Sequence, residues 1–226
     1  MTNYIPQNLV IIMDNKFPGK DISIDDLKSK IPLCAKKNKN HHSIVKVKNI
    51  EFGGKNIPIL AGPNTVENSQ MINKIGKFLK SIKICGIRGG AFKPLTFPYR
   101  SKKYYETKLD GLKWLKETKN KYGLISTTEI MDIKYLEDIC NSTDIIQIGS
   151  RNMQNYPLLT ECAKTQMPIM LKRHYGSSLR DWLGAAEYIL AEGNKNVILC
   201  ERGVSVPHTH RSSSRFLMDL QVIPSV

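Results

Sequence analysis

Six short runs of mainly apolar residues recur along the chain, and each ends in polar or basic residues. They occupy residues 57–64, 82–90, 124–131, 144–152, 168–173 and 196–203. The runs begin 20 to 42 residues apart, and the sequence between them has the apolar spacing of amphipathic helices. This alternation predicts repeated βα units, and therefore a parallel sheet covered by helices.

The clearest helix is predicted at residues 178–193, where Gly193 can end it. Its apolar face consists of Leu179, Trp182, Leu183, Ala186, Ile189 and Leu190. Two lysine-rich helices are predicted at residues 71–83 and 109–123, with the lysines on a solvated face. Residues 210–226 have the pattern of one more helix, following the sixth strand.

Residues 1–45 are predicted to form an N-terminal extension and basic linker, and residues 46–226 a partial (β/α) barrel. Within the extension we predict a strand at 8–15 and a short helix at 23–31. Residues 34–42 are rich in lysine, asparagine and histidine and are typical of an exposed connector. Alternating apolar and polar residues around Gly53 and Gly54 then predict a β-hairpin that leads into the first barrel strand.

Composition limits the class of protein. A chain of 226 residues with 41% hydrophobic and 24% charged residues fits one globular domain and excludes wholesale disorder. Because no apolar run approaches ~20 residues and the N-terminus lacks a basic start, we expect no membrane span and a cytoplasmic location. The five scattered cysteines predict free thiols in a reducing compartment, with Cys85 and Cys200 buried in strands.

The net charge of +14 favours an anionic partner. Most of the lysines fall on predicted helix faces, where they are solvated. Residues 34–42 are the best basic contact patch, but no zinc-finger spacing, phosphate loop or aromatic RNA-binding signature accompanies them. A nucleic-acid partner is therefore not favoured.

Polar and charged side chains gather where the predicted strands end. They are Asn64, Arg88, Glu129, Arg151, Lys172, Arg173, Glu201 and Arg202. The carboxyl ends of parallel strands meet at one face of a barrel, so these side chains should form one site. Their positive excess predicts an anionic substrate.

Several motifs then occur in a specific order, at residues 61–70, 87–94, 127–132, 147–155, 170–173 and 185–203. Together they resemble the 3-deoxy-D-arabino-heptulosonate 7-phosphate (DAHP) synthases, of the short type related to 3-deoxy-octulosonate 8-phosphate synthases. The resemblance spans residues 57–226. It implies a TIM-type barrel that condenses phosphoenolpyruvate with an aldose phosphate, such as erythrose 4-phosphate at the start of the shikimate pathway.

The resemblance also implies roles for individual residues. Arg151, Lys172 and Arg202 would hold the phosphate of phosphoenolpyruvate, and Arg88 with Lys93 its carboxylate. Guanidinium and ammonium groups suit such a trianionic ligand. The catalytic candidates are Lys93, Glu129 and Asn64, and the further substrate-binding candidates are Thr96, Gln147 and Arg173.

Two residues depart from the family pattern. Asn64 stands where metal-dependent members carry cysteine, and an amide is a poor ligand for a soft divalent metal, so no cofactor is expected. Leu95 replaces an arginine that clamps the aldose phosphate, so either the aldose differs or another cation of that loop substitutes. The substitutes are Arg100, Lys102 and Lys103. The pair His208 and His210 is a metal candidate that lacks a third ligand, and a loop or phosphate-contact role competes with it.

The resemblance further implies that the last two βα units are missing. Six strands cannot close an eight-stranded barrel, so we expect open edges covered by a second copy, by a partner chain or by a missing C-terminal part of the same gene product. The alternative is a catalytically inactive, basic descendant of the fold that serves as a binding or structural subunit.

Overall fold

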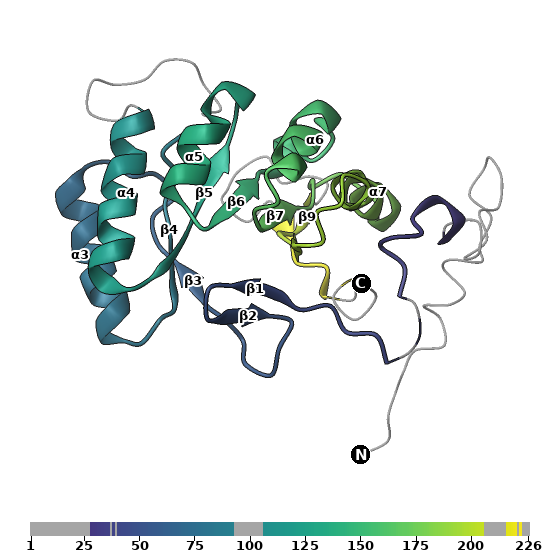
Figure 1. Cartoon of the computed structure of the whole chain (residues 1–226), viewed down its shortest axis with the longest axis horizontal. Helices are drawn as coiled ribbons and strands as arrows, with labels where there is room; N and C mark the ends of the chain where they lie inside the picture. The colour runs from purple at the N-terminus through teal and green to yellow at the C-terminus, as the bar shows by residue number, and fades with distance from the viewer. Residues whose placement is uncertain are drawn as a thin grey trace.

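A computed structural model describes residues 28–36, 38, 40–92, 106–205, 216–220 and 222. Within these ranges six strands form one parallel sheet in chain order, which curls into an open half-barrel (Figure 1). The strands are β3 (Leu60–Ala61), β4 (Gly86–Arg88), β5 (Ile125–Ile130), β6 (Ile145–Ile148), β7 (Ile169–Lys172) and β8 (Val197–Cys200). The prediction of an incomplete (β/α) barrel is confirmed. In the described part of the chain, β3 and β8 have no strand on their outer edges.

Helices follow the strands and cover the convex side of the sheet (Figure 1). They are α3 (Ser69–Ser81), α4 (Lys108–Tyr122), η1 (Ile133–Tyr135), α5 (Leu136–Ser142), η2 (Ser150–Asn152), α6 (Tyr156–Lys164) and α7 (Leu179–Ala191). The helices predicted at residues 71–83, 109–123 and 178–193 are therefore present, as α3, α4 and α7. Helix α7 begins with a capping box, in which Ser178 and Asp181 each accept a hydrogen bond from the other's backbone N–H.

The lysine-rich helices have the expected solvated face, with one exception. Lys74, Lys77 and Lys80 of α3 are exposed. Lys119 of α4 is buried, so the prediction is wrong for this residue. Its place on the helix turns it toward the sheet, where Asp144 accepts a hydrogen bond from its ammonium group.

Alternate residues of the strands face opposite sides of the sheet. Ile146, Ile148 and Leu171 pack with the helices α5 to α7 in the largest buried cluster. Ile125 and Ile145 instead pack in a smaller cluster on the concave side, with the N-terminal hairpin. This alternation decides which strand-end side chains can enter the barrel interior.

The hairpin consists of β1 (Val45–Val47) and β2 (Ile50–Phe52), and it lies at the amino ends of the barrel strands (Figure 1). Its turn is formed by Lys48 and Asn49, so the prediction of a turn at Gly53 and Gly54 is wrong. Gly53 has φ +87°, and a Cβ atom there would lie 2.4 Å from the Ser43 carbonyl oxygen. Gly53 is therefore required by this close approach of two backbone segments and not by a hairpin turn, although both give the same glycine signal in the sequence.

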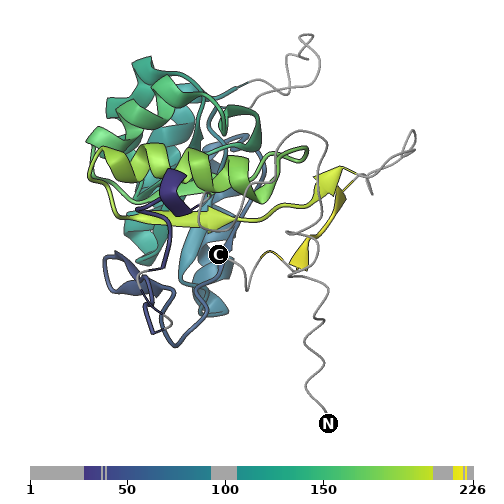
Figure 2. The same ribbon diagram turned by 90° about the vertical axis from the view of Figure 1, so that its right-hand side faces the viewer.

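The C-terminal prediction also requires correction. Phe216–Leu217 form strand β10, which pairs antiparallel with β9 (Val204–Ser205) instead of continuing a helix. Figure 2 shows this two-stranded ribbon projecting beside the main sheet. The helical pattern is overridden because β9 offers backbone hydrogen bonds to Phe216 and Leu217.

The cysteines are all free thiols, as expected. However, Cys85 precedes β4 and Cys200 ends β8, and both are only partly buried, which contradicts the predicted burial. Cys162 of α6 is the fully buried thiol, and burial raises its pKa to about 12. Strand ends lie at the rim of the sheet, whereas α6 faces its centre.

The segment before the hairpin docks on α7. The backbone N–H groups of Leu33 and Cys34 donate to the Glu187 carboxylate at 2.9 and 2.8 Å, and Figure 2 shows this segment beside the helix. The strand predicted at 8–15 and most of the helix predicted at 23–31 lie outside the described residues. None of the described helices combines the length and apolarity that a membrane crossing requires.

Candidate active site

The concave side of the sheet carries the polar strand-end side chains at its carboxyl edge. Period-two alternation from the interior residues Ile125 and Ile145 places Glu129 and Gln147 on this side. The same reasoning from Met170 places Lys172 there, and from Ile198 it places Cys200. Register brings them into contact range, since Glu129 lies opposite Gln147 and Lys172 opposite Cys200.

Two contacts between predicted site residues join neighbouring strand ends on the β3 to β6 side of the site. The Arg88 guanidinium donates to the Asn64 side-chain oxygen at 3.4 Å, which joins the ends of β3 and β4. The Gln147 amide donates to a Glu129 carboxylate oxygen at 3.1 Å, which joins the ends of β5 and β6. Gly149 lies directly against Glu129, because a Cβ atom at Gly149 would be 1.8 Å from the other carboxylate oxygen. The Glu129 carboxylate is thus held by its neighbours on both sides.

Cys200 lies opposite Lys172 at the carboxyl edge, close enough to several charged residues for them to affect its pKa. Burial raises the pKa of its thiol, and so does the negative charge of Glu201, whereas the positive charges of Lys172, Arg202 and Arg88 act to lower it. These three cations come from β7, from the loop after β8 and from β4, so they surround the carboxyl edge from both sides of the half-barrel. Such a group of positive charges provides a site for a small polyanion.

Arg151 lies on the same edge. It is in η2, directly after β6, and its side chain is exposed. A 3₁₀ turn at the end of a strand sets this side chain at the mouth of the half-barrel and not inside it. An exposed Arg151 at this edge can be reached from solvent.

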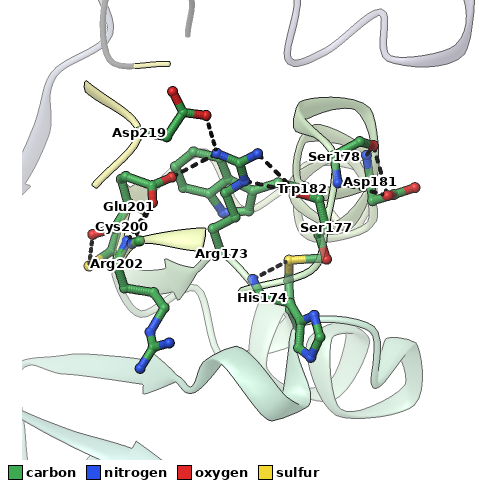
Figure 3. A network of polar contacts seen from close by, with 12 residues as sticks. Arg173, His174, Ser177, Ser178, Asp181, Trp182, Cys200, Glu201, Arg202 and Asp219 are labelled. Atoms are coloured by element: carbon green, nitrogen blue, oxygen red, sulfur yellow. Dashed lines mark hydrogen bonds and ion pairs between the residues drawn. The ribbon is translucent and has the colours of Figure 1, made fainter. Parts of the chain in front are cut away.

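Arg173 is placed differently from its neighbour Lys172. Its guanidinium donates to Glu201 at 3.0 Å, to Asp219 at 2.9 Å and to the Ser177 carbonyl oxygen at 3.1 and 2.9 Å (Figure 3). Its side chain is only 7% exposed. Burial opposes its charge, but the hydrogen bonds from Arg173 to these carboxylates raise its pKa. A direct substrate contact by Arg173 stays a prediction, and the geometry favours a positioning role.

This network supports Arg202. The carboxylate of Glu201 accepts hydrogen bonds from the backbone N–H groups of Arg202 and Gly203 through Oε1, at 3.0 and 2.6 Å. Its other oxygen is held by Arg173. Figure 3 shows the Arg202 guanidinium directed away from that of Arg173. Glu201 therefore fixes the turn that carries Arg202, and Arg173 fixes Glu201.

Thr127 is an interior residue of the candidate site that the sequence pattern did not indicate. Thr127 lies opposite Arg88 in the β4–β5 register and is buried, and its hydroxyl has no hydrogen-bond partner among the described residues. It lies between Ile125 and Glu129 on the strand, two positions from each, and so shares their concave side. The period of the strand could have identified it, but a threonine in an apolar run is usually interpreted as a β-former.

Other predicted site residues cannot be placed. Lys93, Thr96, His208 and His210 lie outside the described residues, as do Leu95, Arg100, Lys102 and Lys103. Among the residues that the structure does describe, no three His, Cys, Asp or Glu side chains converge as a metal-binding group. Asn64 offers only an amide, and its oxygen already accepts from Arg88. The described residues therefore include no set of side chains that fits a divalent metal ion.

Comparison with known proteins decides the family. The family model described as "DAHP synthetase I family" matches residues 35–224. The chain belongs to the DAHP synthetase I family. A phospho-2-dehydro-3-deoxyheptonate aldolase of Thermotoga maritima is 34% identical over 184 residues, which cover 81% of this chain and 53% of that protein. A 2-dehydro-3-deoxyphosphooctonate aldolase of Pisum sativum is 30% identical over 155 residues, or 64% of this chain and 51% of the relative.

Solved structures of this family agree with the fold. A truncated form of the 3-deoxy-D-arabino-heptulosonate 7-phosphate synthase of Thermotoga maritima aligns with a TM-score of 0.75 and 30% identity, over 87% of this chain and 69% of that one. The crystal structure of the DAHP synthase of the same organism gives a TM-score of 0.74 and 32% identity, over 83% and 52%. This chain spans about half the length of the curated relatives it matches.

Proposed function

We propose that this chain provides the phosphoenolpyruvate half of an enzyme that condenses phosphoenolpyruvate with an aldose phosphate to a 3-deoxy-ulosonate phosphate. The observation that carries the proposal is that Arg88, Lys172 and Arg202 lie at or just after the carboxyl ends of three strands of one parallel sheet, which all end at the same edge. Phosphoenolpyruvate bears a phosphate and a carboxylate, and a site with several cations from different strands can hold both. The matched relatives carry the names of enzymes with such products, which gives no support to an inactive, structural role.

The proposed mechanism assigns each group a task. Arg151, Lys172 and Arg202 bind the phosphate, and Arg88 binds the carboxylate together with Lys93. The methylene carbon of phosphoenolpyruvate attacks the aldehyde carbon, which forms the new C–C bond, and the aldehyde oxygen takes up a proton to become a hydroxyl group. Water then adds to the phosphate-bearing carbon, and inorganic phosphate leaves. The cations stabilise the negative charge that develops as these bonds change.

Glu129 and Gln147 are proposed to orient water. Their hydrogen bond holds the Gln147 amide against the Glu129 carboxylate at the carboxyl edge of the sheet. A carboxylate in this place can accept a proton from an attacking water molecule. Asn64 is proposed to orient Arg88, to which it is hydrogen-bonded.

An activity assay tests the proposed function. The full chain is incubated with phosphoenolpyruvate and a panel of aldose phosphates that begins with erythrose 4-phosphate. Release of inorganic phosphate that depends on both substrates, with formation of a 3-deoxy-ulosonate phosphate, supports the proposal. Because Leu95 replaces the arginine of the family pattern, the panel also identifies the aldose. If no product forms even when a second chain supplies the last two βα units of the barrel, the proposed function is contradicted.

We also propose that this chain works without a resident metal. Asn64 supplies no thiolate, and the described residues contain no other group of ligands for a divalent ion. We expect elemental analysis of the purified, dialysed protein to find far less than one divalent ion per chain. Near-stoichiometric metal would contradict this and would direct attention to His208 and His210.

We further propose that the half-barrel associates with a second copy or with a partner chain that completes it. Ile57 and Ile59, beside the edge strand β3, are 89% and 52% exposed, and Leu217 of β10 is 65% exposed. At ~25 cal/mol per Å², covering ~300–600 Å² of such surface corresponds to ~7–15 kcal/mol of transfer free energy, of which only the part above the entropic cost of association stabilises the complex. We expect light scattering after size-exclusion chromatography to show a species larger than one chain. A stable monomer near 25.6 kDa that unfolds cooperatively would contradict this.

A further inference from the structure

A second basic site lies at the opposite end of the sheet from the candidate active site. A hollow of about 470 Å³ opens between the hairpin turn and the ends of α3 and α4. It reaches Ile125, the first residue of β5, whereas Glu129 lies near the end of that strand. Its lining includes Lys48, Lys80, Lys83, Lys119, Ile84 and Leu124.

The charges around this hollow are not balanced. The ammonium groups of Lys48 and Lys119 both contact the same oxygen of Asp144, at 2.9 and 3.0 Å. The other oxygen of Asp144 accepts from the backbone N–H and the hydroxyl of Ser126, at 2.8 and 3.3 Å. No Asp or Glu lines the hollow, and no ion pair within the described residues involves Lys80 or Lys83. Among the described residues, one carboxylate therefore pairs with two of the four lysines, and the other two have no ion pair.

The local backbone keeps two of these lysines at the rim. Lys83 follows α3 with φ +59°, in the left-handed position where glycine is usual. Its N–H donates to the Lys80 carbonyl oxygen at 3.2 Å, and that of Ile84 donates to the Leu79 carbonyl oxygen at 3.0 Å. This closed turn fixes where Lys80 and Lys83 leave the chain. Glycine would end the helix at this position with less backbone strain, so helix termination alone does not explain a lysine here.

Helix ends account for part of the positive charge only. The C-terminal ends of α3 and α4 carry partial negative charges, which lysines complement. The carbonyl groups of Leu79, Lys80 and Lys119 already accept backbone hydrogen bonds, from Ile84, Lys83 and Leu124. Two partial charges and one carboxylate do not offset four ammonium groups, of which Lys119 is buried.

We propose that this hollow binds a small phosphate-bearing anion, separate from the substrates of the condensation. Ammonium groups are compact charges that suit phosphate oxygens from several directions. Ile84 and Leu124 offer an apolar wall to the remainder of such a ligand. The ligand would link the hairpin to the ends of α3 and α4, and so would brace the amino end of the half-barrel. This inference does not rest on the proposed function.

Calorimetric titration with inorganic pyrophosphate tests the site on the full chain. The probe variant is Lys80→Gln with Lys83→Gln, and both lysines are exposed, so the variant should fold. The matched control is Lys74→Gln with Lys77→Gln, which removes the same charge from exposed positions of the same helix. We expect the dissociation constant to rise at least ~10-fold in the probe variant, since each charge-assisted contact is worth about that factor. The control should change it less than twofold.

The titration is repeated with variants that also carry Lys172→Ala, which separates pyrophosphate binding in the hollow from binding at the active-site cations. Equal losses in probe and control would show general electrostatic attraction and overturn the inference, as would the absence of pyrophosphate binding on the Lys172→Ala background. Phosphoenolpyruvate is titrated into the same lysine variants. Unchanged phosphoenolpyruvate binding together with a failed pyrophosphate result would overturn this site and leave the proposed function standing.

Discussion

Replacing Lys172 or Arg151 with alanine is expected to abolish measurable phosphoenolpyruvate binding while the protein stays folded. Lys172 lies on the concave side opposite Cys200, and Arg151 lies at the mouth of the same edge. Removing one partner of a desolvated, hydrogen-bonded charge pair typically costs ~2–5 kcal/mol of binding free energy. Calorimetric titration measures the loss directly.

The control for this experiment is Lys77→Ala, which removes an exposed lysine from α3 and should leave binding unchanged. Circular dichroism confirms that each variant is folded. Affinity for phosphoenolpyruvate within about twofold of the original chain in both site variants would contradict the proposed site. The same result in only one of them would remove that residue from the phosphate-binding set.

Replacing Arg173 with methionine is expected to lower the free energy of unfolding by ~3–5 kcal/mol, because the change leaves the Glu201 carboxylate buried without its cation. Glu201 is only 5% exposed in its side chain, whereas Asp219 is 33% exposed and can be solvated. The loss should therefore come mainly from Glu201. Denaturant unfolding measures it.

Arg180→Met is the matched control, since Arg180 is exposed on α7, and such surface changes usually alter stability by less than ~0.5 kcal/mol. Adding Glu201→Gln to Arg173→Met should recover part of the stability by removing the orphaned charge. A stable Arg173→Met variant that has lost only phosphoenolpyruvate binding would instead make Arg173 a substrate ligand, as the family resemblance implied.

Local pattern was sufficient for most of the framework. The apolar runs identified all six strands because strands buried on both faces must be apolar along their length. Ser178 and the apolar face around Trp182 identified α7, since a cap and a helical period are properties of neighbouring residues. The cations at strand ends could be grouped into one site, because parallel strands bring their carboxyl ends to the same edge.

Other features depend on contacts between distant parts of the chain. Lys172 and Arg173 are adjacent and alike in sequence, but only the pairing of Arg173 with Glu201 and Asp219 turns it away from the interior. Thr127 became a site residue through its register with Arg88, and Lys119 became a buried lysine through Asp144.

The amino-acid sequence by itself thus determined the strands, the main helices and the positive character of the carboxyl edge, because these follow from local periodicity and residue type. Only the tertiary structure decided the place of the hairpin turn, the pairing of β9 with β10 and the direction of each cation. The physical reason is that a turn, an edge pairing or an ion pair is chosen by competing partners in space. Those partners become neighbours only when the sheet has formed.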